Sequence, residues 1–198
     1  MASTPSGKWR STLIWGSLLA AILVPLGVAA LSPLLAWRAP IYIVAGFAGV
    51  LAMAVLLVQP LLIGGYLPDL SPRQRRQLHQ WTGAVLVVLV VAHVLGLWVT
   101  SPPDVIDALL VRSPTPFSIW GVMAMWGVFM TAALFGVKWR LQPYLWRVIH
   151  TVLVTVIVVA SVVHALMIDG TMGSITKVAL CAMVLAGMAK VIFDKHVR

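Results

Sequence analysis

The chain alternates long apolar stretches with short breaks rich in polar residues and proline. Uncharged runs cover residues 11–37, 39–68, 77–103, 113–137 and 148–168, and a sixth apolar run covers 173–193. A helix needs about 20 apolar residues to cross the hydrocarbon layer, so each run is long enough for one span. The breaks at 32–33, 64–65 and 142–143 contain the Ser, Gly and Pro residues typical of turns. The pattern predicts an all-α polytopic membrane bundle with six transmembrane helices.

Composition supports this fold class and excludes several others. Hydrophobic residues make up 61% of the 198 positions and charged residues 10%, whereas charged residues make up about 25% of an ordinary soluble domain. A soluble, disordered, coiled-coil or secreted disulfide-rich chain is therefore excluded. The single cysteine, Cys181, rules out an internal disulfide and a cysteine-ligated cluster, and no C-x-x-C-H motif is present to attach a c-type heme. Lys177 and Lys190 lie near the ends of the sixth run, where their side chains can snorkel to the interface.

The placement of Lys and Arg predicts the topology. The net charge is +9, and the basic residues divide into eleven on one side of the membrane (Lys8, Arg10, Arg73, Arg75, Arg76, Lys138, Arg140, Arg147, Lys190, Lys195, Arg198) and three on the other (Arg38, Arg112, Lys177). By the positive-inside rule both termini are cytoplasmic. This predicts a cytoplasmic tail at 1–10, a transmembrane domain at 11–194 and a cytoplasmic tail at 195–198, in a bacterial inner membrane. Cationic loops facing anionic lipid explain the charge, so no nucleic acid partner is expected. Cleavage of the first span as a signal peptide is the alternative for residues 1–30.

Four of the five histidines form a repeated pattern, while the fifth, His196, lies in the basic tail. His79 and His93 are 14 positions apart in the third span, and His150 and His164 are 14 positions apart in the fifth. At about 100° per residue, 14 positions return close to the same helix face, and they rise about 21 Å. Each span therefore carries one histidine near each membrane surface.

The third and fifth spans run in the same direction, because one span separates them. Equal spacing then brings His79 opposite His150, and His93 opposite His164, which is the arrangement of two bis-histidine heme b groups stacked across the bilayer. A proton relay, a different metal site or simple helix packing are the alternatives. One shared zinc or copper ion is excluded, because its three or four ligands would have to converge on one point.

Other residues could support such a cofactor. Arg76 and Arg147 each precede a histidine by three positions and could pair with heme propionates, or could simply anchor the helices at the cytoplasmic surface. Gly83 and Gly96 follow their histidines by four and three positions, which would let a porphyrin approach the backbone or let helices pack closely. Two small residues before His164 could leave room for the heme: Ala160 and Ser161. Three aromatic residues of the fourth span could flank the heme or pack in the core: Trp120, Trp126 and Phe129. Six tryptophans near the span ends could line the membrane interfaces: Trp15, Trp37, Trp81, Trp98, Trp139 and Trp146.

Over roughly residues 40–195 the chain resembles the ferric reductase-like transmembrane domain family. That family includes ferric reductases, NADPH oxidases and the heme subunit of a bacterial periplasmic methionine-sulfoxide reductase system. The segment Arg76-x-x-His79-x-x-x-Gly83, followed by His93, is similar to its first heme helix, and Arg147-x-x-His150, followed by His164, to its second. Val154 stands where the second helix would match Gly83. Respiratory cytochrome b, with histidine pairs on its second and fourth helices, is the alternative resemblance.

The resemblance implies six helices, with heme ligands on the third and fifth. We therefore expect a diheme b-type cytochrome that carries electrons from a cytoplasmic or quinol donor to a periplasmic acceptor, with the four histidines as axial iron ligands. An accessory subunit of a larger energy-transducing complex, or a transporter or proton channel, is the alternative. The sequence also leaves open whether the chain is itself an oxidoreductase, since it shows no flavin or nicotinamide domain, and whether a flavin or quinone binds. The expected partners are the lipid bilayer and a redox protein.

Overall fold

The predicted apolar runs form six membrane-length helices in the computed structural model, which describes residues 5–113 and 115–196. These six are α1 (Pro5–Ala30), α2 (Pro40–Gly64), α3 (Pro72–Thr100), α5 (Pro116–Val137), α6 (Pro143–Met167) and α7 (Ser174–His196). A short helix, α4 (Pro102–Leu109), and two 3-10 turns, η1 (Pro33–Leu35) and η2 (Lys138–Arg140), complete the secondary structure of the described residues, which contain no strand. The chain is thus a helical membrane bundle, as predicted.

Local sequence determines where the helices begin. Proline occupies the first position of α2, α3, α4, α5 and α6, where its missing N–H and fixed φ are compatible with a helix start. Before α3, Ser71 accepts from the N–H of Gln74 and the Gln74 side chain accepts from the N–H of Ser71, a complete capping box. Because this cap lies ahead of the arginines, α3 begins at Pro72 rather than at 77. Helix α1 begins at Pro5, inside the cytoplasmic tail predicted for residues 1–10.

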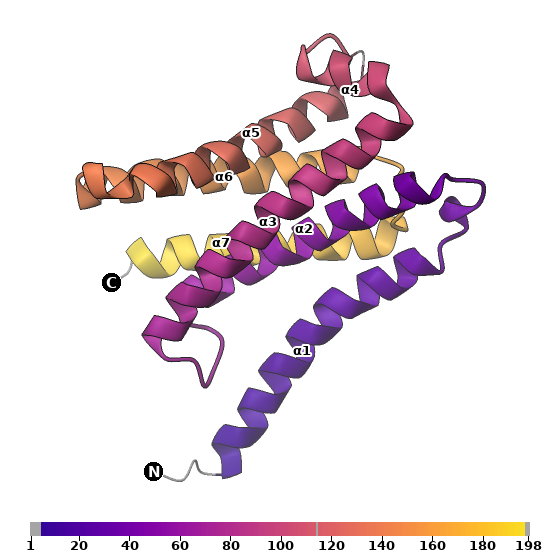
Figure 1. Ribbon diagram of the computed structural model, residues 1–198. Coiled ribbons are helices and arrows are strands. Elements are labelled where there is room, and N and C mark those ends of the chain that lie inside the picture. The colour runs from indigo at the N-terminus through magenta and orange to yellow at the C-terminus, as the bar shows by residue number, and fades with distance from the viewer. Residues whose placement is uncertain (1–4, 114, 197–198) are drawn as a thin grey trace.

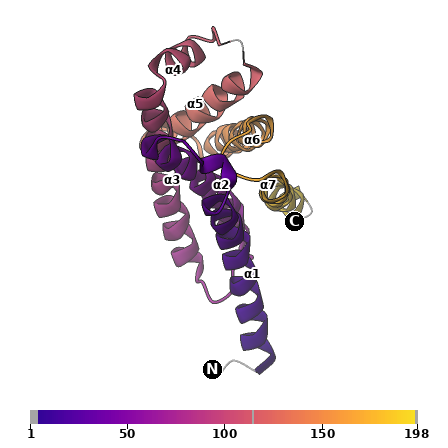
Figure 2. The same cartoon turned by 90° about the vertical axis from the view of Figure 1, so that its right-hand side faces the viewer.

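The connection between α3 and α5 contains a short helix, α4. The segment Ser101-Pro102-Pro103-Asp104 explains the helix, because proline and an acidic side chain both favour a first turn. The apolar side chains of Ile106 and Leu110 remain exposed at the end of the bundle. Such an amphipathic turn is suited to lie at the membrane surface. Figures 1 and 2 show α4 at one end of the molecule, between the ends of α3 and α5.

Two antiparallel hairpins, α2–α3 and α5–α6, form the main body of the bundle. Helices pack most extensively within each hairpin, and α7 packs against both α2 and α6. Among the described residues α3 and α6 make few direct contacts with each other, although they run in the same direction (Figure 1). The core lies around α2, α6 and α7, with Leu57, Val158 and Val184 among its buried side chains. Helix α1 diverges from the bundle toward its N-terminal end (Figures 1 and 2), as an extra lipid-facing helix.

The two hairpins also repeat in sequence. The segment Gly49-Val50-x-Ala52-Met53 of α2 recurs in α5 as Gly121-Val122-x-Ala124-Met125. The second helices of the hairpins match as well, since Pro72 and Pro143 both precede the first histidine of their helix by seven positions. The bundle therefore contains two halves that are related in sequence, one formed by α2–α3 and one by α5–α6.

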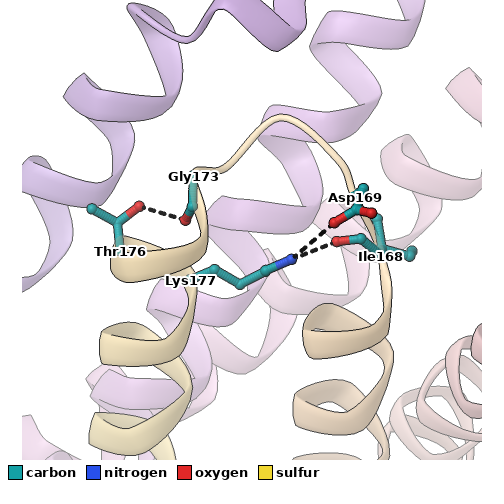
Figure 3. Close-up of polar contacts among 5 residues, drawn as sticks. All are labelled: Ile168, Asp169, Gly173, Thr176 and Lys177. Atoms are coloured by element: carbon teal, nitrogen blue, oxygen red, sulfur yellow. Dashed lines mark hydrogen bonds and ion pairs between the residues drawn. The ribbon is translucent and has the colours of Figure 1, made fainter.

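Lys177 does not snorkel outward as expected. It lies in the first turns of α7 with its side chain 9% exposed, and its Nζ donates to the carbonyl of Ile168 at 2.6 Å, with Asp169 at 3.9 Å (Figure 3). Ile168 caps the C-terminus of α6, where carbonyl groups lack helical partners and the helix dipole favours a cation. The lysine therefore turns inward and ties the α6–α7 loop to α7.

Candidate functional site

The four histidines of α3 and α6 meet as two pairs between these helices. The ring centroids of His79 and His150, the first pair, are 6.3 Å apart, with 78° between the ring planes. The centroids of His93 and His164, the second pair, are 6.4 Å apart, with 85° between the planes. All four side chains are partly buried. Within each pair one ring comes from each hairpin, and the two pairs are separated along the helices by about 21 Å.

The second pair is held by the backbone of the neighbouring helices. His93 Nδ1 lies 2.7 Å from the carbonyl oxygen of Ala45 in α2, and His164 Nδ1 lies 2.8 Å from that of Phe117 in α5. A carbonyl oxygen only accepts, so Nδ1 must carry the proton and donate it. In a neutral imidazole Nε2 then carries the lone pair, which is the form that binds a metal. The two contacts occupy equivalent positions in the two hairpins.

The first pair has different neighbours. The Trp146 ring stacks on His150, one helical turn further along α6, with centroids 5.1 Å apart and 18° between the planes. On the other hairpin, the Gln59 amide lies beside α3, and its Nε2 donates to the backbone carbonyl of His79 at 3.4 Å. The first pair is thus bordered by an indole on one side and an amide on the other, where the second pair has backbone carbonyls.

The ring separations fit a metal ion between two imidazoles. With a metal–nitrogen bond of about 2 Å and roughly 1.15 Å from the nitrogen to the ring centre, the centroids of two opposed imidazoles lie about 6.3 Å apart. Both measured separations agree with this value. Within residues 5–113 and 115–196, no group of three or more His, Cys, Asp or Glu side chains could hold an ion. Each pair can therefore supply two imidazole ligands to one ion, without a third His, Cys, Asp or Glu ligand from the described residues.

The arginines and glycines singled out from the sequence lie on the same two helices as the histidines. Arg76 is exposed and, with Arg75, lines an open cavity of about 310 Å³ at the start of α3. Arg147 is exposed, and its Nε donates to the carbonyl of Pro143. A Cβ at Gly83 would make an ordinary 3.6 Å contact with Gln59. A Cβ at Gly96 would lie 2.7 Å from that of Ala45, which favours the helix-packing interpretation of this glycine.

Several residues around the pairs were not predicted from the sequence. Gln59 is the amide side chain of an otherwise apolar span, and such a polar group in a membrane helix is a signal that could have been used. The stacking of Trp146 was available from its position four residues before His150. The carbonyls of Ala45 and Phe117 carry no sequence signal, because every residue has one.

Residues 45–161, more than half of the chain, match the family described as ferric reductase like transmembrane component. The match begins at the carbonyl that holds His93 and ends three residues before His164, so it includes both hairpins almost completely. No curated protein and no solved structure matched the chain. Six apolar helices place it in the membrane, and the family is one of membrane electron-transfer components. The chain belongs to the family of ferric reductase-like transmembrane components.

Proposed function

We propose that this protein is a diheme b-type cytochrome that conducts electrons across the bilayer. The observation that supports this most directly is the pair of ring separations, 6.3 and 6.4 Å, at two levels of the membrane. Each level offers two histidines, and within residues 5–113 and 115–196 no group of three or more His, Cys, Asp or Glu side chains could hold an ion. A planar macrocycle provides the four equatorial ligands that such a site lacks, and heme b needs no cysteine for attachment.

The four histidines would hold the two hemes, His79 with His150 and His93 with His164. A bound heme supplies one-electron chemistry at its iron. Two histidines would hold each iron from the protein side, which would leave no coordination position for a substrate and favours an electron conduit over a catalytic centre. The Nδ1–H bonds from His93 and His164 keep those imidazoles in the metal-binding tautomer and raise their basicity. Arg76 and Arg147 are exposed near the starts of α3 and α6, and they could pair with the propionates of a bound heme.

The orientation of the two pairs in the membrane follows from the positive-inside rule. Eleven of the 14 Lys and Arg residues belong to the side on which α3 and α6 begin. The first pair is then cytoplasmic and the second pair periplasmic, with both termini in the cytoplasm of a bacterial inner membrane. Electrons would pass from a cytoplasmic or quinol donor, through the first pair and then the second, to a periplasmic acceptor protein.

The test is heme quantification on the purified chain. A pyridine hemochrome assay should give two heme b per polypeptide, and a reduced-minus-oxidised spectrum should show b-type bands. One heme per chain would mean that one pair does not ligate iron. No heme would refute the proposal and leave a proton path as the function of the histidines. Co-purification with fixed partner subunits, rather than as a single chain, would instead identify an accessory component of a larger complex.

The orientation has its own test. A reporter fused after Arg198 should be active only if that reporter works in the cytoplasm. A periplasmic C-terminus would reverse the assignment of the two pairs while leaving the heme proposal intact.

A further inference from the structure

A glycine of the neighbouring hairpin helix lies beside each second-pair histidine, with no room for a side chain. A Cβ built on Gly49 of α2 would lie 3.0 Å from His93 Nδ1, and one built on Gly121 of α5 would lie 2.7 Å from His164 Cε1 and 2.8 Å from its Nδ1. Contacts this short require the imidazole to move. The two glycines are equivalent members of the repeated Gly-Val-x-Ala-Met segment.

The position of these glycines explains how a helix carbonyl can be reached by a second donor. In an α-helix the carbonyl of residue i points along the axis toward residue i+4, whose N–H it accepts. Ala45 and Phe117, which accept from the histidines, precede Gly49 and Gly121 by four positions. A side chain at i+4 would stand beside that oxygen, in the space where the imidazole lies. Hydrogen at this position leaves the oxygen open to Nδ1–H.

We propose that Gly49 and Gly121 are positioning residues for the second heme, each orienting one axial imidazole by exposing the carbonyl to which it is anchored. This inference rests on the proposed diheme function and extends it to two residues outside the heme-bearing helices. The anchor fixes the tautomer, and it fixes the rotation of each ring about its side-chain bonds. The 85° between the planes of His93 and His164 is therefore set by α2 and α5.

Two glycine-to-alanine substitutions test the proposal, with heme content and electron paramagnetic resonance (EPR) as readouts. Gly121→Ala forces the larger displacement and should lower the content from two hemes to one, with loss of the same low-spin signal that is lost in His164→Ala. Gly49→Ala, with its longer contact, should retain two hemes and shift the EPR signal of that heme only. The first heme should remain in both variants, which also shows that the chain has folded.

Two matched controls lie on α5. A Cβ on Gly127 would lie 2.7 Å from Ile157 Cγ1, so Gly127→Ala strains the same α5–α6 interface without touching a histidine. A Cβ on Gly136 has nothing within 4 Å. Both variants should keep two hemes with unchanged EPR signals. If Gly127→Ala removes the second heme as Gly121→Ala does, helix separation is the cause and the proposal is overturned.

Failure of this inference is distinguishable from failure of the proposed function. A wild-type chain without heme refutes the function itself. A wild-type chain with two hemes, together with unchanged heme content and EPR signals in both Gly121→Ala and Gly49→Ala, refutes only the positioning role. If Gly121→Ala does not accumulate in the membrane, the shift expected in Gly49→Ala decides the question.

Discussion

Shared coordination predicts which histidine substitutions are equivalent. His79→Ala and His150→Ala should each affect the first heme, and His93→Ala and His164→Ala the second, because the rings of each pair are 6.3 and 6.4 Å apart and the pairs are about 21 Å from each other. Each single variant should fall from two hemes per chain to one, or keep a second heme as a five-coordinate, high-spin form.

The double variants provide the quantitative test. If one substitution already removes the coordination, the second within the same pair costs nothing more, so the coupling free energy equals in size the loss caused by a single substitution. Contacting residues typically show couplings of about 0.5–3 kcal/mol, whereas distant sites add independently. His79→Ala combined with His150→Ala should therefore match either single variant, and His79→Ala combined with His93→Ala should lose both hemes.

The assay is heme content together with the low-spin EPR signals of the purified variants. Loss of the same heme in His79→Ala and His93→Ala, with the other heme intact, would refute the pairing. That result would also contradict the structure, in which α3 and α6 bring their histidines opposite each other.

Three further predictions concern the imidazole planes, Trp146 and Lys177. Both hemes should give highly anisotropic low-spin EPR signals, because nearly perpendicular imidazole planes leave two iron d orbitals close in energy; the more rhombic spectrum of parallel rings would contradict the structure. Trp146→Leu should alter the spectrum of the first heme only, because it removes the ring stacked on His150. Trp139→Leu, at an exposed position, should have no effect. Equal spectra for the two variants would exclude a role of Trp146 in orienting His150. Lys177→Met should lower the free energy of unfolding by about 1.5–3 kcal/mol, through loss of a charged hydrogen bond. Both losses are measured by thermal denaturation. Removal of the exposed ion pair between Lys190 and Asp194 should cost less than about 1 kcal/mol of unfolding free energy. A larger loss for the Lys190 variant than for the Lys177 variant would contradict the buried position of Lys177.

The fold followed from the sequence because membrane spans obey simple rules. Hydrocarbon thickness sets the length of each apolar run, and an intervening span makes the helices that carry His79 and His150 parallel. Equal spacing of 14 residues in both helices then left one arrangement of the four rings. Lengths, direction and spacing are properties of the chain alone, so the structure could agree with them in detail.

Contacts between hairpin helices did not follow in the same way. Whether Ala45 or another residue of α2 faces His93 depends on the register of two antiparallel helices, and an almost uniformly apolar span gives no polar face from which to read it. Lys177 was assigned to the interface because lysine usually reaches for water, but the unsatisfied C-terminus of α6 offered a nearer partner. These features depend on tertiary packing, which single-residue tendencies do not describe.

The sparse contact between α3 and α6 has a consequence for the life of the protein in the cell. In the proposed diheme protein each half of the bundle would contribute one ligand to each heme, so a bound heme would hold the two halves together. A ligand present at 100 times its dissociation constant adds about 2.7 kcal/mol of stability, and two sites add about twice that. In cells short of heme, neither heme would link the two halves. The halves would then separate more often and expose the chain to membrane proteases. The abundance of this protein should therefore follow the heme supply, even with its synthesis held constant.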